Sequence, residues 1–337
     1  MKSVALNERF FEGAVSVEIV DGACKPWRLP HDRLRLFDNG HVGNAAVASG
    51  VRLRFATDAA EILLRVAPQP QLDAGPQKFD LTVEGELLST AILPAGQDEV
   101  RFSALPEGTK TVELWLPQHG PTTVRELLVE NGASTGLVPD ERPKWITYGS
   151  SITHCSKAHS PARTWPATVA RKHKLNLTSL GFGGQCHLDP LIGVLIRDLP
   201  ADFISLKLGI NTGGSLGART FPFLAIGLVR ILREKHPTTP VALISPIISP
   251  PREDTPQKAG QTLNDMRKEL ADACQRLRDC GDANVHYFDG RELFGADLVE
   301  NYLPDLLHPN GDGYEKLGAN FSRVVMEKML PEMRRGK

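Results

Sequence analysis

The sequence predicts an α/β protein in which an all-β, jelly-roll-like sandwich precedes a three-layer α/β/α domain with a five-stranded parallel sheet. Two patterns lead to this prediction. Up to about residue 130, apolar residues alternate with polar ones, which is the period of a strand buried on one face. After a polar segment rich in Gly and Pro at 131–144, uniformly apolar runs alternate with longer amphipathic segments. That second pattern is typical of buried parallel strands joined by helices.

Length and composition limit the possible functions. The 337 residues suit two domains, which we expect at 1–137 and 144–337. Because 39 Lys and Arg residues balance 40 Asp and Glu residues, we expect no nucleic-acid partner. No window is long and apolar enough to span a bilayer, and Glu8 and Arg9 interrupt the segment where a signal peptide would be apolar. We therefore expect a cytoplasmic protein with no membrane partner.

The cysteine and histidine patterns predict neither a disulfide framework nor a metal site. The five Cys residues are an odd number at irregular spacing, without a CxxC pair, so free buried thiols are expected. No spacing of His, Asp or Glu indicates metal ligation, and no cofactor is expected.

In the first domain the alternating runs are short, and segments such as "FDNGHVGN" (37–44) and "APQPQLDAGPQ" (67–77) separate them. Such Gly, Pro, Asp and Asn clusters favour hairpins and loops over helices. Strands are expected near 15–19, 34–36, 51–55, 79–83 and 112–116. A contact surface or a solvated strand face could be formed by Trp27, Arg28, His31, Arg33 and Arg35.

In the second domain, apolar strands are expected at 145–149, 175–182, 202–209, 240–247 and 284–290. Helices are expected at 161–172, 188–198, 221–235 and 262–278, and Thr262 and Asp265 can cap the last of these. A C-terminal helix follows, with its apolar face formed by Tyr314, Leu317, Phe321 and Val324. This order requires right-handed crossovers between parallel strands.

Polar or flexible residues follow the first three of these strands. Ser150 and Ser151 follow the first, where a serine can expose its hydroxyl above the sheet or simply cap a helix. Gly181, Gly183 and Gly184 follow the second, where they allow either a close approach to a ligand or an ordinary flexible loop. The third is followed by Asn211, whose amide can stabilise an oxyanion or tie two loops together.

Asp305 and His308 lie three residues apart, between Pro304 and Pro309. At this spacing the carboxylate can accept a hydrogen bond from Nδ1 of His308 and leave Nε2 free to act as a base. A histidine on a surface loop is the alternative. Because ligands bind beyond the carboxyl ends of parallel strands, we expect these residues to gather at one edge of the sheet.

The segments "YGSSIT", "GFGGQ", "GIN" and "DLLHP" together resemble the four blocks of the SGNH, or GDSL-type, hydrolase superfamily. The resemblance covers essentially the whole second half of the chain. It implies Ser151 as nucleophile, His308 as base, Asp305 as the partner of the base, and the Ser151 N–H, the Gly184 N–H and the Asn211 side chain as oxyanion donors. Two positions depart from the family pattern: Ser150 and Thr212 stand where many members have Asp.

A β-sandwich before such a domain is similar to the arrangement in carbohydrate esterase family 2 and in the salicylyl acyltransferases of tetracycline biosynthesis. The resemblance implies a serine esterase that hydrolyses O-acyl esters, above all acetyl esters, of a sugar or glycoside, with a carbohydrate-binding-module-like first domain. The alternative is an acyltransferase that moves an acyl group from acyl-CoA to a sugar hydroxyl of a glycosylated natural product. A carbohydrate-binding protein with an inactive hydrolase domain is a third possibility, and the presence of all five site positions argues against it.

Four further residues lie close to these motifs. Cys155 and Cys186 are expected to line the pocket, since a cysteine mechanism would need a base beside one of the thiols and His154 lies too close to Ser151 in the sequence to be assigned that role. Arg163 and Trp165 could border the acyl pocket, although a helix start with Trp165 in the core is favoured.

Overall fold

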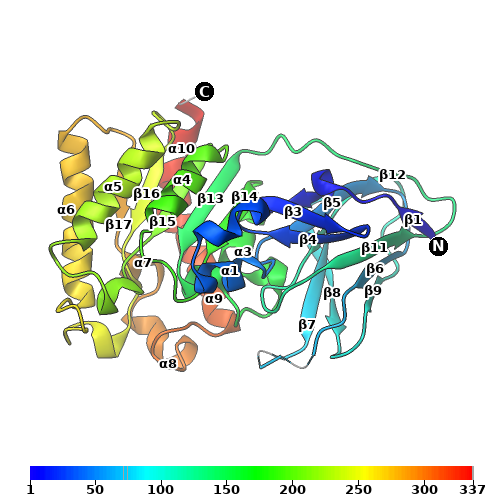
Figure 1. Cartoon of the computed structure of the whole chain (residues 1–337), viewed down its shortest axis with the longest axis horizontal. Helices are drawn as coiled ribbons and strands as arrows, with labels where there is room; N and C mark the ends of the chain where they lie inside the picture. Colours follow the sequence, from blue (N-terminus) through cyan, green and yellow to red (C-terminus); the bar gives the residue numbers. More distant parts are fainter. Residues whose placement is uncertain (71, 74, 336–337) are drawn as a thin grey trace. The chain divides into compact units, whose positions relative to one another are not determined.

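The computed structural model describes residues 1–70, 72–73 and 75–335, so Gln71 and Ala74 of the loop expected at 67–77 lie outside it. The described chain forms two compact units (Figure 1). The first contains Met1–Arg142 and Ala158–Ser179, and the second contains Pro143–Lys157 and the chain from Leu180 onward.

The first unit contains two antiparallel sheets, each with six strands among the described residues. One has the order β3-β4-β11-β6-β9, with β1 paired to β11. Its strands are β1 (Lys2–Val4), β3 (Ser16–Val20), β4 (Ala23–Trp27), β6 (Ile62–Val66), β9 (Glu99–Phe102) and β11 (Val124–Val129). The other has the order β12-β5-β10-β7-β8, with β2 paired to β5. Its strands are β2 (Phe11–Glu12), β5 (Arg52–Thr57), β7 (Gln77–Val83), β8 (Glu86–Leu93), β10 (Lys110–Trp115) and β12 (Thr135–Gly136).

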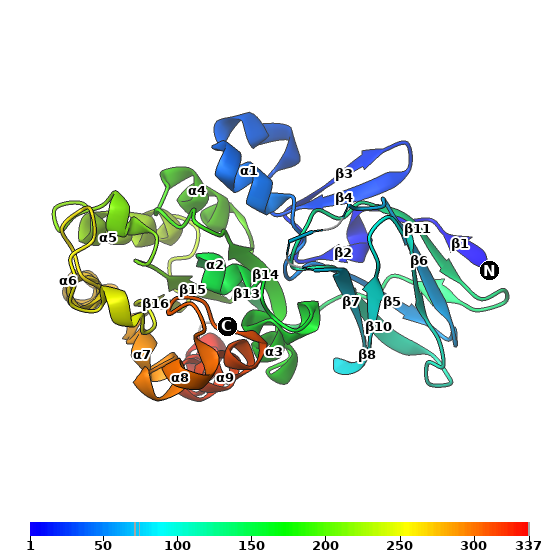
Figure 2. The ribbon, with the colours of Figure 1, turned by 90° about the horizontal axis from the view of Figure 1, so that it is seen from below.

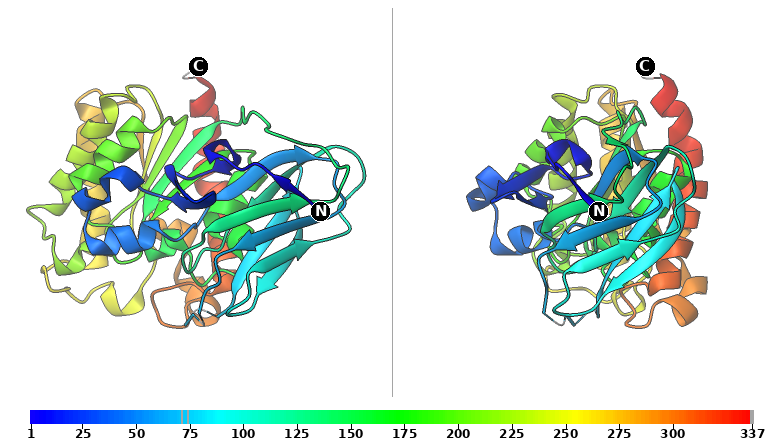
Figure 3. Two further views of the ribbon diagram at one scale, coloured as in Figure 1. Left: turned by 45° about the vertical axis from the view of Figure 1, so that its right-hand side comes forward. Right: turned by 90° about the vertical axis from the view of Figure 1, so that its right-hand side faces the viewer.

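The period-two pattern explains how these sheets pack (Figure 3). Leu114 of β10 pairs with Leu53 of β5, and Val112 pairs with Phe55 two positions further along, so their side chains share one face. These residues join Leu64 and Leu127 of the other sheet in a single buried core. The predicted all-β sandwich is therefore confirmed.

Two predictions for the first unit are wrong. Leu34 and Leu36 lie in a 3₁₀ helix, His31–Leu36, rather than in a strand, and Leu36 is exposed. The segment "FDNGHVGN" contains helix α1 (Asn39–Ala45) rather than a hairpin. The Asp38 side chain explains this start, since its Oδ1 accepts hydrogen bonds from the N–H groups of Gly40 at 2.8 Å and His41 at 3.1 Å.

The five candidates for a surface on the sandwich do not share one environment. Trp27 and Arg28 are buried, whereas His31, Arg33 and Arg35 are exposed on the 3₁₀ helix. The Arg28 guanidinium donates to the backbone carbonyls of Val47, Asn44 and Ser179. Arg28 therefore fixes the backbone at the end of α1 and at Ser179, and it is not part of a solvated strand face.

The first unit also includes the segment that contains α3 (Trp165–Lys172). The Arg52 guanidinium donates to the Leu177 carbonyl at 2.9 Å and to Oδ1 of Asn176 at 2.6 Å. Asp80 accepts a hydrogen bond from the Ala162 N–H at 2.7 Å. Trp165 is fully buried at the start of α3, as the core alternative predicted.

The parallel sheet has the order β14-β13-β15-β16-β17, which confirms the predicted five strands. Its strands are β13 (Lys144–Gly149), β14 (Asn176–Gly181), β15 (Phe203–Lys207), β16 (Val241–Ile244) and β17 (Val285–Phe288). All residues of β15 and β16 are buried, because helices cover both faces. Helices α4 (Pro190–Asp198), α5 (Phe221–Arg233) and α6 (Leu263–Asp279) lie along one face (Figure 2). On the other face, Phe321 of α9 (Gly311–Phe321) packs against Trp145 of β13.

The helices of the second unit are α2 (Ser151–His154), α4 (Pro190–Asp198), α5 (Phe221–Arg233), α6 (Leu263–Asp279), α7 (Gly290–Leu293), α8 (Val299–Tyr302), α9 (Gly311–Phe321) and α10 (Glu327–Arg335). Helices α4, α5 and α6 begin and end close to the predicted positions, whereas the short helices α2, α7 and α8 were not predicted. The capping box of Thr262 and Asp265 is confirmed. At the C-terminus a π-helical turn, Ser322–Met326, shifts the apolar face, so Val325 is buried where Val324 was expected.

The five cysteines are free, and Cys280 is exposed rather than buried as expected. Over the described residues, no helix has both the length and the apolar character needed to cross a membrane. In the same part of the chain, no three His, Cys, Asp or Glu side chains form a cluster that could hold a metal ion.

Candidate active site

The two serines after β13 have different positions. Ser150 is the buried N-cap residue of α2, and its Oγ accepts a hydrogen bond from the Ile152 N–H at 3.3 Å. Ser151 is the first residue of that helix, which ends after one turn at Cys155 in the left-handed conformation. The structure therefore gives the capping role to Ser150, the residue that stands in place of the family Asp.

Glycines at the strand ends allow this turn to pack closely. A Cβ atom on Gly149 would lie 2.3 Å from Oγ1 of Thr153, and one on Gly181 would lie 2.3 Å from the His154 nitrogen. No larger residue fits at either position without a shift of the backbone or of Thr153. The absence of a side chain at these two glycines therefore allows α2 to pack closely against the strand ends.

The Oγ atom of Ser151 lies 2.9 Å from Nε2 of His308. His308 lies just before α9, whose N-cap residue Asn310 accepts a hydrogen bond from the Gly313 N–H at 2.8 Å. The structure thus brings together the two residues that the sequence predicted as nucleophile and base.

Asp305 lies on the other side of the imidazole ring, with its Oδ2 atom 2.9 Å from Nδ1 of His308. A carboxylate only accepts hydrogen bonds, so Nδ1 carries the proton and Nε2 of the neutral ring is the acceptor. The Ser151 hydroxyl therefore donates to Nε2. This arrangement gives an unbroken line of hydrogen bonds from Ser151 through His308 to Asp305.

Asp305 is held in its charged form. Burial raises its pKa, but hydrogen bonds from the His308 N–H at 2.6 Å, from Nζ of Lys157 at 2.9 Å and from the Leu307 N–H at 3.1 Å outweigh this effect. The pKa of Asp305 consequently lies well below its usual range. Sequence reasoning missed Lys157, because nothing in its local pattern indicates a partner 148 positions away.

Gly184 and Asn211 lie in the loops after β14 and β15, and Cys186 links these loops. The Asn211 Oδ1 atom accepts a hydrogen bond from the Cys186 N–H at 3.1 Å. Because Oδ1 has this partner, the Nδ2 group is the part of the amide that is oriented to donate. Gly184 has φ +73°, and a Cβ atom added there would meet no other atom within 4 Å, so open space lies beside this turn.

The thiols near the site are not positioned as pocket lining, contrary to expectation. Cys155 and Cys186 are both buried, and the Cys155 Sγ atom lies 3.2 Å from the Ile152 carbonyl oxygen. Burial raises the pKa of the Cys186 thiol to about 12. A thiol in this state is neutral near pH 7 and is a poor nucleophile.

Lys207, the last residue of β15, is a buried basic residue that sequence reasoning passed over. It is 2% exposed, and burial lowers its pKa to about 8. The signal was present in the sequence, since Lys207 ends the otherwise apolar strand "FISLK".

Comparisons with known proteins agree with this fold. Residues 10–124 match the family described as "SsfX3, N-terminal domain", and residues 143–326 match the "GDSL-like Lipase/Acylhydrolase family". None of the curated proteins compared with the chain matches it.

Three solved structures are similar over nearly the whole chain. The salicylyl acyltransferase SsfX3 from a tetracycline biosynthetic pathway is 38% identical, with 99% of each chain covered and a TM-score of 0.90. A protein from Bacteroides ovatus described as a GDSL-like lipase is 20% identical, with 96% of each chain covered and a TM-score of 0.78. A family two carbohydrate esterase from Clostridium thermocellum, solved with cellohexaose, is 16% identical, with 85% of this chain and 94% of that chain covered and a TM-score of 0.65.

The last two similarities, at 20% and 16% identity, concern the fold alone. The family match covers more than half of the chain and includes the segments of Ser151, Gly184, Asn211 and His308. Together with the SsfX3-type first domain, this match shows that the chain belongs to the GDSL-like lipase/acylhydrolase family.

Proposed function

We propose that the protein forms an acyl-serine at Ser151 and passes the acyl group to a hydroxyl of a small-molecule acceptor. The observation that supports this most strongly is the line of hydrogen bonds from Ser151 through His308 to Asp305. A serine hydroxyl is a weak nucleophile until a base takes its proton, and this geometry supplies the base.

In the proposed reaction, Nε2 of His308 takes the proton of Ser151 as Oγ attacks the carbonyl carbon of the acyl donor. The negative charge moves to the former carbonyl oxygen, where the N–H groups of Ser151 and Gly184 and Nδ2 of Asn211 donate hydrogen bonds. Asp305 stabilises the imidazolium ion. His308 then gives its proton to the leaving group.

In the second half of the reaction, His308 takes a proton from the acceptor hydroxyl, whose oxygen attacks the acyl-serine carbonyl. The second tetrahedral intermediate collapses, and Ser151 leaves with the proton from His308. The new ester contains the acceptor oxygen, and the enzyme returns to its starting state.

Transfer to an alcohol is the first candidate because the relative that is 38% identical over 99% of the chain is a salicylyl acyltransferase. By analogy the donor is an activated acyl group such as acyl-CoA, and the acceptor is a hydroxyl of a glycosylated natural product. Hydrolysis of sugar esters, which the sequence alone favoured, is the second candidate. It is supported by the exposure of the two side chains, 25% for His308 and 41% for Asp305, which gives water access to the base.

Trapping the acyl-serine tests the proposal. Purified protein is mixed with an aryl acetate, quenched and digested, and mass spectrometry is expected to find an acetyl group on the peptide that contains Ser151. Ser151→Ala should abolish the label and lower kcat by about three decades or more, whereas Ser150→Ala should keep the label. A label on another residue, or full turnover by Ser151→Ala, would show that the chemistry is different.

A partition experiment then separates the two candidates. The enzyme is given an acyl-CoA together with a glycoside, and the ester and the free acid are both quantified. Ester formation that rises with glycoside concentration supports transfer. Release of free acid alone, independent of the glycoside, supports hydrolysis.

A further inference from the structure

The backbone between Asp305 and His308 is strained. Leu306 has φ +57°, in the left-handed region that an L residue with a branched side chain rarely adopts. Such a conformation is unfavourable and persists only where surrounding contacts hold it. Leu306 itself is 41% exposed, so its side chain provides little of that restraint.

The peptide group that joins Leu306 to Leu307 is held at both of its polar ends. Its N–H end, on Leu307, donates to Oδ1 of Asp305 at 3.1 Å. Its carbonyl end, on Leu306, accepts a hydrogen bond from Oγ of Ser249 at 2.7 Å. Because the C=O and N–H of a trans peptide point in opposite directions, Ser249 and Asp305 together fix the rotation of this plane.

The direction of the Ser249 hydroxyl proton is also fixed. Ser249 is 1% exposed, and its Oγ atom accepts a hydrogen bond from Nη1 of Arg252 at 2.9 Å. A hydroxyl has a single proton, so with Arg252 donating to the oxygen that proton points to the Leu306 carbonyl.

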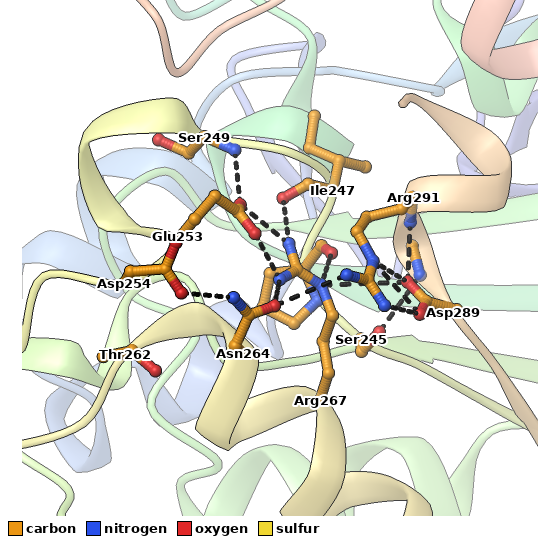
Figure 4. Close-up of polar contacts among 12 residues, drawn as sticks. Ser245, Ile247, Ser249, Glu253, Asp254, Thr262, Asn264, Arg267, Asp289 and Arg291 are labelled. Atoms are coloured by element: carbon orange, nitrogen blue, oxygen red, sulfur yellow. Dashed lines mark hydrogen bonds and ion pairs between the residues drawn. The ribbon is translucent and has the colours of Figure 1, made fainter. Parts of the chain in front are cut away.

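Ser249 lies in the loop after β16, and Arg267 of α6 makes this loop rigid (Figure 4). The buried guanidinium donates to the carbonyls of Pro246 and Ile247 and to Oδ1 of Asn264. It also forms two hydrogen bonds to the Glu253 carboxylate, of 2.6 and 2.9 Å. All five N–H donors of Arg267 therefore have an acceptor.

Glu253 extends this network to Ser249, since its Oε1 atom accepts a hydrogen bond from the Ser249 N–H at 2.9 Å. The side chain of Ser249 thus projects from a backbone that is anchored through Glu253 and Arg267 to helix α6. Because the backbone of Ser249 is held in place, its hydroxyl can restrain the strained peptide group at Leu306.

We propose that Ser249 is a positioning residue, which holds the Leu306–Leu307 peptide so that Asp305 and His308 keep the geometry in which His308 accepts the Ser151 proton. This inference rests on the proposed function. Ser249 does not touch the reacting atoms, so it acts on the rate of the chemical step and not on binding of the acyl donor. Its loss lets the left-handed turn relax and disturbs the alignment of the proposed base.

The test compares Ser249→Ala with Ser245→Ala, using turnover of an aryl acetate and thermal unfolding. Ser245 is a matched control, since it is buried in the same loop region and its Oγ accepts hydrogen bonds from the Gly290 N–H at 3.0 Å and the Tyr287 hydroxyl at 3.1 Å. Ser249→Ala is expected to lower kcat by about tenfold at nearly constant KM, the effect of losing one hydrogen bond. Ser245→Ala should keep kcat within about twofold of the parent, even if it lowers the thermal stability as much as Ser249→Ala does.

Two further variants keep the proposal open to refutation if Ser249→Ala folds poorly. Ser249→Thr restores a hydroxyl and should recover most of kcat. Leu306→Gly, combined with Ser249→Ala, removes the penalty of the positive φ and should also recover part of kcat. If neither variant recovers activity, Ser249 does not act through the Leu306 backbone.

Ser151→Ala separates failure of this inference from failure of the proposed function. If Ser151→Ala retains turnover, the proposed function is wrong, and the positioning role of Ser249 that rests on it is wrong as well. If Ser151→Ala is inactive but Ser249→Ala and Ser245→Ala lower kcat equally, only the positioning inference is wrong.

Discussion

The hydroxyl oxygen of Ser151 and the Nε2 atom of His308 are 2.9 Å apart, although 157 positions separate the two residues in the chain. Ser151 follows β13, the first strand of the parallel sheet in chain order, and His308 precedes α9, beyond the last strand β17. Their contact therefore depends on the fold of the whole second unit. A mutation can therefore impair the site either by removing a group from it or by disturbing that fold.

Asn211→Ala is expected to lower kcat by about two to three decades with a smaller change in KM. The Nδ2 group of Asn211 is the proposed oxyanion donor, and an oxyanion contact strengthens as charge develops in the transition state. The measurement is steady-state kinetics with an aryl acetate. Asn320→Ala is the control, since Asn320 donates to the Leu293 carbonyl and has no proposed role. Equal effects of the two variants would contradict the assignment of Asn211.

Asp305 should contribute to stability in a pH-dependent way. Its pKa is lowered in the folded protein, so its contribution is present above the unfolded value of about 4 and is lost as pH falls through the folded value. Relative to Asp305→Asn, the parent protein is expected to lose unfolding free energy progressively below about pH 4. Urea titrations of both proteins between pH 7 and pH 3 measure this difference. A constant difference across that range would show that Asp305 is not held in its charged form.

Lys207 is expected to destabilise the protein at neutral pH. Burial lowers its pKa to about 8, below the ordinary value of about 10.5, so the unfolded chain binds more protons between these two values. Stability therefore rises with pH from about 8 to about 10.5 as the folded lysine loses its charge more readily. Lys207→Met should abolish this rise and raise the unfolding free energy at pH 7, by a few kcal/mol. Urea unfolding of both proteins at pH 7 and pH 9.5 is the test, and an equal rise in the variant would contradict it.

Glu113→Ala is expected to destabilise the first unit by about 3–5 kcal/mol, because it removes the buried carboxylate that Arg52, Arg54 and Arg142 share. Oε1 of Glu113 accepts from Arg52 at 3.3 Å, from Arg54 at 3.2 Å and from Arg142, and Glu113 is 1% exposed. Glu99→Ala serves as the control, since its ion pair with Arg65 is exposed and should contribute about 1 kcal/mol or less. Thermal unfolding is the measurement. Similar losses of thermal stability in both variants would show that the buried Glu113 network contributes no more than an exposed ion pair.

The division into a sandwich and a parallel-sheet domain could be predicted because both depend on periodicity. Alternation at residues such as Val112 and Leu114 reflects one buried face, and the uniformly apolar β15 reflects two. Helix α1 was missed because "NGHVGNA" contains two Gly and two Asn residues and has a low helix propensity. The Asp38 cap and the burial of His41 and Ala45 compensate for that propensity, and only the folded chain shows both.

The candidate site could be predicted as far as it depends on strand ends. Parallel strands place their carboxyl ends at one edge, so Ser151 and Asn211 could be expected there from their positions alone. Lys157 and Ser249 could not, because their partners, Asp305 and the Leu306 carbonyl, meet them only through the tertiary fold. Ser249 lies in the loop after the fourth strand, within "SPIISPP", where serine is the only residue type with catalytic chemistry.

In the sequence, the segment Ala158–Ser179 lies between two parts of the second unit, but in the structure it belongs to the first unit, with the sandwich. Its backbone carbonyls at Leu177 and Ser179 are acceptors for the buried side chains of Arg52 and Arg28. A cut at the linker near residue 143 would therefore place these guanidinium groups in one fragment and their carbonyl acceptors in the other. An exchange of the first unit for that of a relative must therefore include the segment Ala158–Ser179 as well as Met1–Arg142.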